Sequence, residues 1–216
     1  MNSEDKRESK GKIVIVGGGL TAGTLAGSLS EHGHNVVLIA RQQLKTEQFD
    51  FPPVWLGPKA LAEFASETDF RRRYETIQQN RGEGSITPDI MERLLDTPNI
   101  DIYPETCICD IVEAAAQRLR VETTRGVIAD VSRVILATGY RFDLRRYGFL
   151  RELITQHQVP LVCGFPRLDD DLQLHPIENL FGSGTIAQLQ IGPASGNIAG
   201  ANLAYERLRE EFISHL

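Results

Sequence analysis

The sequence predicts an α/β fold in which a Rossmann-like parallel sheet carries helices on both faces, with a β-meander and a helical insertion. Three observations predict this class. Ile13–Val16 is a continuous apolar run rich in β-branched residues, as in a strand buried on both faces of a parallel sheet. Glycines follow at once, and a helical segment then leads to a second apolar run, Asn35–Ala40. A third apolar run, within Arg133–Asp143, is again followed by glycine.

Length and composition are those of an ordinary globular protein. The chain has 216 residues, of which 41% are hydrophobic and 24% are charged, and one compact core is feasible at this size. We expect residues 1–10, which are polar and charged, to form a disordered lead without the apolar core of a signal peptide. We expect residues 11–216 to form a single domain with an insertion at about 42–99.

Charge and hydropathy argue against two kinds of partner. The net charge of −6 disfavours a general nucleic-acid binder, because phosphate backbones require a surplus of Lys and Arg on one face. No window approaches the roughly 18 apolar residues of a membrane-spanning helix, so we expect a cytoplasmic protein. The histidines and cysteines show no metal-ligand spacing, and we expect no metal site. Cys107 and Cys109 lie in a strand-like run and are expected to pack in the core.

The glycines after the first strand form the pattern G-x-G-x-x-A. Gly17 permits a tight turn, Gly19 lets the backbone approach a pyrophosphate, and Ala22 takes the third position. A helix from about Leu20 to His32 follows, and its N-terminal N–H groups would face the phosphates. The alternative is a glycine-rich turn that binds no nucleotide. The candidate cofactor-binding residues at this turn are Gly17, Gly18, Gly19, Leu20, Thr21 and Ala22.

The end of the second strand indicates which dinucleotide is preferred. An Asp or Glu there would accept hydrogen bonds from a ribose 2′-hydroxyl, whereas this chain has Ala40 and then Arg41. A guanidinium suits a 2′-phosphate because its planar fork can donate to two phosphate oxygens. This position therefore favours NADP(H) over NAD(H) and disfavours FAD. In the alternative interpretation, Arg41 is a solvated surface residue without a ligand.

The segment from residue 42 to residue 99 has a helical pattern, interrupted by turn formers. It is an insertion in the Rossmann pattern or a helical cover over its mouth. Trp55, the single tryptophan, is interpreted as a packing anchor, with the wall of a ligand pocket as the alternative. The cluster Arg71–Arg73 is interpreted as a solvated helix face.

The rest of the chain contains strands and a final helix. Residues 100–136 form short alternating runs that predict β-strands joined by tight turns, and a buried strand then leads into "ATGYRFD". Near the end, Gly192 and Pro193 precede a helix predicted from Ala194 to about Glu211, which carries several small residues. That helix either faces a flavin or packs closely against the sheet.

Several motifs together resemble a known class of enzymes. The strand, the GGG turn, the helix, the meander and "ILATGYRFD" resemble the FAD/NAD(P)-binding oxidoreductases with two dinucleotide sites. More narrowly, "FDFPPVWLGPKAL", "RGEGSITP" and "IAQLQIGPASGNIAGA" are similar to flavin-dependent N-hydroxylating monooxygenases of lysine and ornithine. The resemblance covers about residues 12–210. It implies that Thr138 and Gly139 lie beside the cofactor, and that a flavin-facing end includes Gly184, Thr185, Gly192 and Pro193.

The sequence departs from the pattern of that class at two points. Thr185 follows Gly184 where the class has an Asp that holds the flavin ribityl chain, and a hydroxyl is a weaker hydrogen-bonding group than a charged carboxylate. The chain also has one clear fingerprint where the class has two. The spacing of "GSGTIA", Gly182–Ala187, fits a second one, but the class pattern places this segment on the last strand, and a turn is an equal alternative.

These observations leave three functional hypotheses. The first is an oxidoreductase unit that binds NADP(H), FAD or both and takes part in hydride transfer. The second is a lone nucleotide-binding module that pairs with a separate flavoprotein chain or senses the NADP(H) pool, and a homodimer is a further expectation. The third is a structural domain without a cofactor. No catalytic acid or base is assigned, because Asp50, Asp143 and His175 are candidates by chemistry alone.

Overall fold

The computed structural model describes residues 10–49, 51–81 and 84–214. These residues belong to two compact units, which we call unit 1 (Met1–Phe49 and Glu83–Gly139) and unit 2 (Asp50–Gly82 and Tyr140–Leu216). The expected single domain of residues 11–216 thus comprises two compact units, and the expected insertion is shared between them. Apart from Lys10, the expected disordered lead lies outside the described residues.

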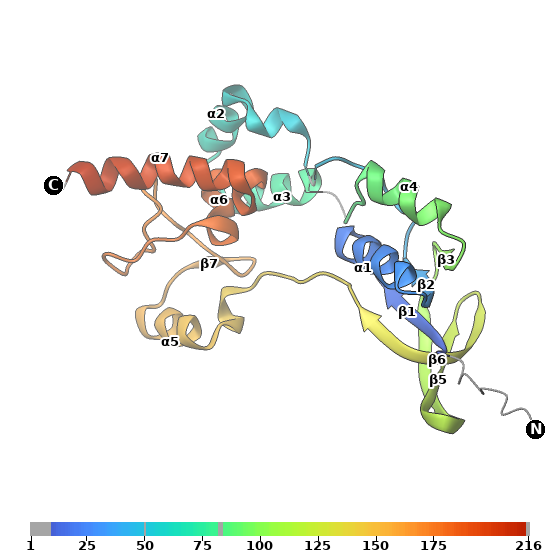
Figure 1. Ribbon diagram of the computed structural model, residues 1–216. Helices are drawn as coiled ribbons and strands as arrows, with labels where there is room; N and C mark the ends of the chain where they lie inside the picture. The colour runs from blue at the N-terminus through green and yellow to red at the C-terminus, as the bar shows by residue number, and fades with distance from the viewer. Residues whose placement is uncertain (1–9, 50, 82–83, 215–216) are drawn as a thin grey trace, which may run out of the picture. The chain divides into compact units, whose positions relative to one another are not determined.

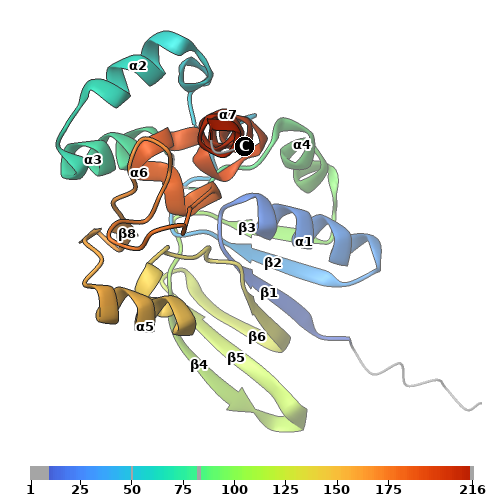
Figure 2. The same cartoon turned by 90° about the vertical axis from the view of Figure 1, so that its left-hand side faces the viewer.

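Unit 1 is built on a six-stranded sheet with the order β3-β2-β1-β6-β5-β4 (Figure 1, Figure 2). Strands β3, β2, β1 and β6 run parallel, whereas β4, β5 and β6 form an antiparallel meander. The Rossmann-like α/β class is therefore confirmed, with a mixed sheet. The bounds are β1 Lys12–Val16, β2 Asn35–Ile39, β3 Ile100–Tyr103, β4 Ile108–Ala114, β5 Arg118–Thr123 and β6 Gly126–Leu136.

One face of the parallel strands is covered by α1 (Leu20–Glu31) and α4 (Pro88–Asp96) (Figure 2). The two helices approach closely because α1 presents glycines to α4. A Cβ added at Gly23 would lie 3.0 Å from a methyl carbon of Ile90, and one at Gly27 would lie 3.3 Å from Arg93. The cluster beneath the helices contains Ile13, Ile15, Ala22, Ala26, Val36, Leu38, Ile86 and Leu94.

The other face differs from the expected second layer of helices, because the sheet itself forms its core. Val14, Val37 and Ile39 of the parallel strands cluster with Val121, Ile128 and Val131 of the meander. Strand β6 is continuous where the sequence predicts two strands, and its register shifts against both neighbours. Asp130, within it, has a positive φ of 56°. Such irregularities bend and twist a strand, so β6 can pair with β1 along one part and with β5 along another.

Unit 2 consists of helices of 4 to 17 residues, 3₁₀ turns and a two-stranded hairpin. Its α-helices are α2 Pro58–Ser66, α3 Phe70–Asn80, α5 Gly148–His157, α6 Gln188–Ile191 and α7 Ile198–Ser214. The hairpin pairs β7 Leu161–Val162 with β8 Phe165–Pro166. The 3₁₀ turns are η1 Pro53–Leu56, η3 Leu144–Arg146, η4 Gly184–Ala187 and η5 Pro193–Gly196. The remaining turn, η2 Ala115–Gln117, belongs to unit 1.

The C-terminal segment differs from the prediction. Gly182–Ala187 does not form the last strand; it contains the turn η4, which is the alternative left open for this segment, and Phe181 makes an isolated bridge with Gln173. The last helix begins at Ile198 instead of Ala194. Gly192 has a φ of 100°, which interrupts the helical backbone, and Pro193 then begins the separate turn η5.

Two other interpretations from the sequence are wrong. Cys107 and Cys109 are exposed, as is Cys163, so the pair points away from the core. Arg73 is buried at 7% exposure, whereas Arg72 beside it is exposed. A helix turns by about 100° per residue, so three consecutive arginines cannot all share one face. Within the described residues, no helix has the length and apolar character needed to cross a membrane.

Candidate functional site

The carboxyl ends of β1, β2 and β6 form the candidate site in unit 1. Strand β1 lies between β2 and β6, and the chain leaves β1 toward β2 on one side while β6 arrives from the meander on the other. In open α/β sheets, ligands bind outside the carboxyl ends of the strands at such a change of direction. The glycine turn, Arg41 and the Thr138–Gly139 segment follow directly after these three strand ends.

Gly17, the first residue of the glycine turn, packs against the backbone of Ala137, which follows β6. Its N–H donates to Ile39 O at 2.9 Å, and Ala137 N donates to Val16 O at 2.8 Å. A Cβ at Gly17 would overlap the carbonyl oxygen of Ala137, and the φ of Gly17 is 153°. This position therefore requires glycine for structural reasons, whether or not a ligand binds.

Gly18 and Gly19 are less constrained by the protein. A Cβ at Gly18 would lie 3.3 Å from the Cβ of Ala40, and one at Gly19 would lie 3.5 Å from the Cα of Gly84. Gly19 has an extended backbone with a φ of −107°, which other residues also adopt. The protein fold therefore does not require glycine at position 19, so a ligand that needs close backbone approach is one reason for its presence.

Helix α1 begins at this turn with Gly19 as its N-cap, and the cap makes no side-chain hydrogen bond. Leu20 and Thr21 are exposed, while Ala22 is fully buried beneath them. The first N–H groups of an α-helix have no partner within the helix, and the helix dipole adds positive potential there. The start of α1 thus offers backbone donors to an anion.

Arg41 lies immediately after β2. Ala40 is buried, and its backbone is fixed by hydrogen bonds from Ala40 N to Tyr103 O and from Thr106 N to Ala40 O. Arg41 is exposed, and no ion pair involves it among residues 10–49, 51–81 and 84–214. The Cβ of Ala40 lies close to Gly18. Arg41 is the next residue in the chain, so its backbone lies near the glycine turn.

The structure adds two neighbours to this site that the sequence did not indicate. Gly84 approaches Gly19, and its segment is fixed by the bridge between Thr46 and Ile86. Gln43, two residues after Arg41, donates from Nε2 to Glu105 Oε2 at 2.8 Å. These contacts join residues that are far apart in the sequence, so no local pattern could have revealed them.

The remaining candidates occupy turns in both units. Thr138 and Gly139 are exposed after β6, and Gly139 has a φ of 72° with no atom within 4 Å of an added Cβ. In unit 2, Gly184 and Gly192 also have positive φ values, and Pro193 is buried. The structure therefore assigns Gly17–Ala22, Arg41, Thr138 and Gly139 to unit 1, and Gly184, Thr185, Gly192 and Pro193 to unit 2.

Thr185 and Arg81 both lie near Gly196, and no sequence motif assigned Arg81 to the candidate site. A Cβ at Gly196 would lie 3.0 Å from Thr185 Oγ1 and 3.7 Å from Arg81 Nη2. Arg81 is the C-cap of α3 and comes from the expected insertion. Trp55 is buried and packs edge-to-face on Phe64 with ring centroids 5.7 Å apart, as expected for a packing anchor.

Two of the three acid and base candidates, Asp143 and His175, have polar partners in the structure. Asp143 accepts hydrogen bonds from Arg145, both from its backbone N–H and from its guanidinium, and these bonds lower the pKa of Asp143. His175 Nε2 lies 3.3 Å from Asp169 Oδ2. Asp50 lies outside the described residues. In the part of the chain that is described, no group of three or more His, Cys, Asp or Glu side chains is arranged to hold a metal ion.

Comparisons with solved structures identify the fold. The chain is similar to ornithine hydroxylase (PvdA) from Pseudomonas aeruginosa, with a TM-score of 0.74 and 19% identity over 95% of this chain. It is also similar to DfoA, an FAD-bound cadaverine monooxygenase from Erwinia amylovora, with a TM-score of 0.68 and 14% identity over 92% of this chain. The fold is that of the FAD/NAD(P)-binding oxidoreductases.

A more distant similarity extends to the flavoprotein disulfide reductase RclA from Escherichia coli, with a TM-score of 0.53 and 16% identity. It covers 97% of this chain and 37% of that protein. The chain spans about half the length of the two monooxygenases, 53% of PvdA and 50% of DfoA. No protein-family model matches the sequence, and no curated protein sequence matches it.

Proposed function

We propose that unit 1 binds a dinucleotide at the carboxyl ends of β1, β2 and β6, and that the chain is an oxidoreductase unit taking part in hydride transfer. The observation that carries this proposal is Gly19, where an added Cβ would make only ordinary contacts with Gly84, so the fold does not require glycine; it lies at the start of α1. The fold shared with FAD/NAD(P)-binding oxidoreductases supports the proposal.

Different residues of this site bind different parts of NADP(H). Gly19 allows the pyrophosphate to approach, and the first backbone N–H groups of α1 donate to it. Arg41 binds the 2′-phosphate, since Ala40 supplies no carboxylate for an unmodified ribose. The nicotinamide, when bound, supplies the hydride, and this chain holds it in position.

Hydride transfer also requires an acceptor at about 3 to 3.5 Å from the nicotinamide. We infer that the acceptor is a flavin, in a monooxygenase-like reaction of a cytoplasmic protein. In one form of the proposal, Gly184, Thr185, Gly192 and Pro193 of unit 2 contact that flavin. In the other, this chain is a non-catalytic module, and a second copy or a separate flavoprotein chain supplies the flavin surface.

Calorimetric titration of the purified chain with NADP⁺ and NAD⁺ tests the cofactor preference. We expect NADP⁺ to bind at least about tenfold more tightly, because charge-assisted hydrogen bonds contribute about 1.5 to 3 kcal/mol each. Arg41→Ala should remove most of this difference, and Arg41→Lys should retain part of it. Arg133→Ala, at an exposed arginine on β6, is the matched control and should change neither affinity. Equal affinities of the unmodified chain for both nucleotides would refute the assignment of Arg41.

Gly19→Ala separates the binding role from the fold. The added Cβ meets only ordinary contacts, so the melting temperature should stay within about 2 °C of that of the unmodified chain. NADP⁺ affinity should nevertheless fall by at least about tenfold, because the methyl group occupies the space for the pyrophosphate. Unchanged affinity would contradict the placement of the pyrophosphate at this turn.

The absorption spectrum of the purified protein distinguishes the two forms of the proposal. Bound flavin gives visible absorption bands, whereas a nicotinamide-binding module has none. The module form also predicts slow NADPH oxidation by the chain with added FAD, and dimerisation or docking of a flavoprotein. Rapid turnover by a strict monomer would contradict the module form.

A further inference from the structure

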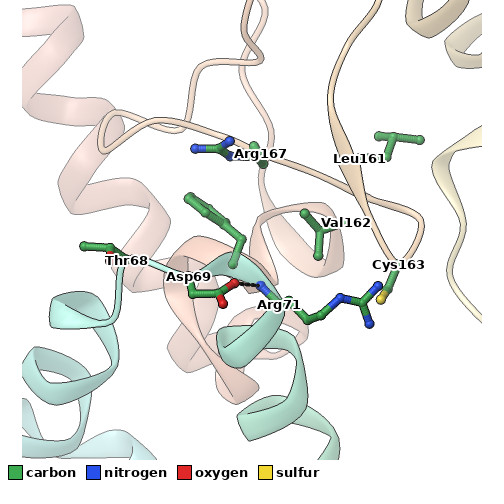
Figure 3. A pocket seen from close by; sticks show the side chains of 8 residues that line it. Thr68, Asp69, Arg71, Leu161, Val162, Cys163 and Arg167 are labelled. Carbon is green, nitrogen blue, oxygen red and sulfur yellow. Dashed lines mark hydrogen bonds between the residues drawn. The ribbon is translucent and has the colours of Figure 1, made fainter.

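A cavity of about 300 Å³ lies in unit 2 between the start of α3 and the β7–β8 hairpin (Figure 3). Asp69, the N-cap of α3, and Arg71 line one side. The other side is lined by Leu161, Val162 and Cys163 of the hairpin and by Arg167, which follows β8. Its volume is at the lower end of the range for small-molecule sites, which is about 300 to 1,000 Å³. None of its lining residues belongs to the candidate dinucleotide site in unit 1.

The two cations of this cavity have no carboxylate partner in the described part of the chain. Neither Arg71 nor Arg167 forms an ion pair there, although Arg72 lies within 4 Å of the carboxylates of Glu67 and Asp69. Figure 3 shows the Arg71 side chain extending from α3 in the direction of the Cys163 sulfur. The cavity therefore has guanidinium groups that the protein itself does not neutralise.

Arg167 is held in place by an aromatic ring. Its Cζ lies 4.6 Å from the centre of the Phe70 ring, and the Cζ of Arg73 lies 4.8 Å from the same ring. Arg73 is buried and fixed by hydrogen bonds, so it limits the movement of Phe70. A cation that is already positioned loses less conformational freedom when an anion binds.

The lining also indicates the charge and shape of the ligand. Asp69 contributes one negative charge against the two guanidinium groups, which favours a monoanion over a dianion such as phosphate. Leu161 and Val162 are half-buried and offer an apolar surface to an alkyl group. We propose that this cavity binds a small organic monocarboxylate with a short apolar chain, with Arg71 as the cation nearest Cys163.

Hexanoate, hexanamide and inorganic phosphate are suitable probes, and calorimetry gives their affinities for the full chain. Hexanamide has the shape of hexanoate without its charge, so we expect hexanoate to bind at least about tenfold more tightly. Phosphate should bind more weakly than hexanoate. Equal affinity of hexanoate and hexanamide, or tighter binding of phosphate, would overturn the proposal.

Cys163 provides a second measurement, because it lines the cavity and is exposed. Bound hexanoate should slow the alkylation of Cys163 by neutral iodoacetamide, followed by mass spectrometry of its peptide. Cys107 and Cys109 are exposed in unit 1 and serve as internal controls whose alkylation should not change. Equal protection of all three thiols, or of none, would contradict binding at this cavity.

A pair of neighbouring variants tests the role of the guanidinium. Arg71→Gln should weaken hexanoate binding by at least about fivefold, whereas Arg72→Gln, one residue further along the same exposed turn, should leave it unchanged. Both residues are exposed, so neither variant should lower the melting temperature by more than about 2 °C. Equal effects of the two variants on binding would show that Arg71 has no specific role. NADP⁺ affinity, measured in parallel, reports on the proposed function independently.

Discussion

Unit 1 and unit 2 are stabilised in different ways. Unit 1 is built on a sheet with apolar clusters on both faces. Two of its glycines allow close approach, of the Ala137 carbonyl at Gly17 and of the Ile90 side chain at Gly23. Unit 2 has helices and 3₁₀ turns without an extended sheet, and a buried arginine joins the end of α2, α3 and α6. Periodic burial makes a regular sheet visible in the sequence, whereas long-range polar contacts leave no period to detect.

Arg73 shows how unit 2 is joined. Its guanidinium donates to the carbonyl oxygens of Ala65, Glu67 and Leu189 and to Gln190 Oε1, at distances from 2.6 to 3.1 Å. Desolvation lowers the pKa of Arg73, although the nearby Asp170 acts in the opposite direction. Two of its four acceptors are carbonyl oxygens at the C-terminal end of α2 and the other two belong to α6, so the cation also lies near the negative end of α2.

The largest effect should come from Arg73→Met. Methionine retains most of the apolar stem but leaves two buried and two partly buried acceptors without their donor, so unit 2 should lose about 3 kcal/mol of its free energy of unfolding. Trp55, the single tryptophan, lies in the aromatic cluster of unit 2, and its fluorescence during urea denaturation reports on that unit. Arg72→Met, at an exposed arginine, should cost less than about 0.5 kcal/mol. Similar losses for the two variants would show that the buried hydrogen bonds do not decide the stability of unit 2.

A pair of glycine variants makes the corresponding test in unit 1. Gly17→Ala places a methyl group onto the carbonyl of Ala137, and we expect it to destabilise unit 1 by about 3 kcal/mol. Gly139→Ala also has a positive φ but meets no atom within 4 Å, so it should cost only about 1 kcal/mol. Far-UV circular dichroism during urea denaturation gives both values. A cost for Gly139→Ala that equals the cost for Gly17→Ala would show that backbone conformation, and not the close contact, determines the requirement for glycine.

The same contrast explains how far the sequence predicted the structure. The apolar runs, the glycine turn and α1 were predicted to within a residue or two, because each has a local signal. The sequence predicts two strands where the structure has the single strand β6. Its register shifts depend on pairing with strands distant in the sequence, which no local pattern reveals. In unit 2, the run from Ala187 to Ser195 is entirely buried although it contains two Gln and a Ser. Arg73 binds Gln190 there, a contact across 117 positions of the chain.

The candidate site shows the same limit. Gly17–Ala22 and Arg41 were found from a motif that imposes its own spacing, but Gly84, Glu105 and Arg81 were not. Each of these residues reaches its neighbours only through the tertiary fold. The lining of the cavity at Arg71 was missed for the same reason, because α3 and the hairpin are separated by about ninety residues of sequence.

The smallest expected effect concerns Asp143, a surface example of the polar contacts typical of unit 2. Its carboxylate caps η3 by accepting from Arg145 N at 3.0 Å, and it also accepts from the guanidinium of Arg145. These hydrogen bonds lower the pKa of Asp143 below its ordinary value of 3.8, so the charged form is favoured by folding. The resulting stabilisation is fully present above the unfolded pKa and is lost as the pH falls through the lower folded pKa.

Asp143→Asn separates the charge from the cap, because an amide oxygen can still accept from Arg145 N. Arg145 is largely exposed, so solvent screening should limit the loss at neutral pH to less than about 1 kcal/mol. The difference in unfolding free energy between the two proteins should be constant above about pH 5 and should shrink as the pH falls below 3.8, with Trp55 fluorescence as the readout. Arg145→Gln should reproduce this loss at neutral pH, and adding Asp143→Asn to it should cost little more, since the two residues share one interaction. A difference that grows toward low pH would mean that the protonated carboxyl is the favoured form, contrary to the hydrogen bonds of the folded protein.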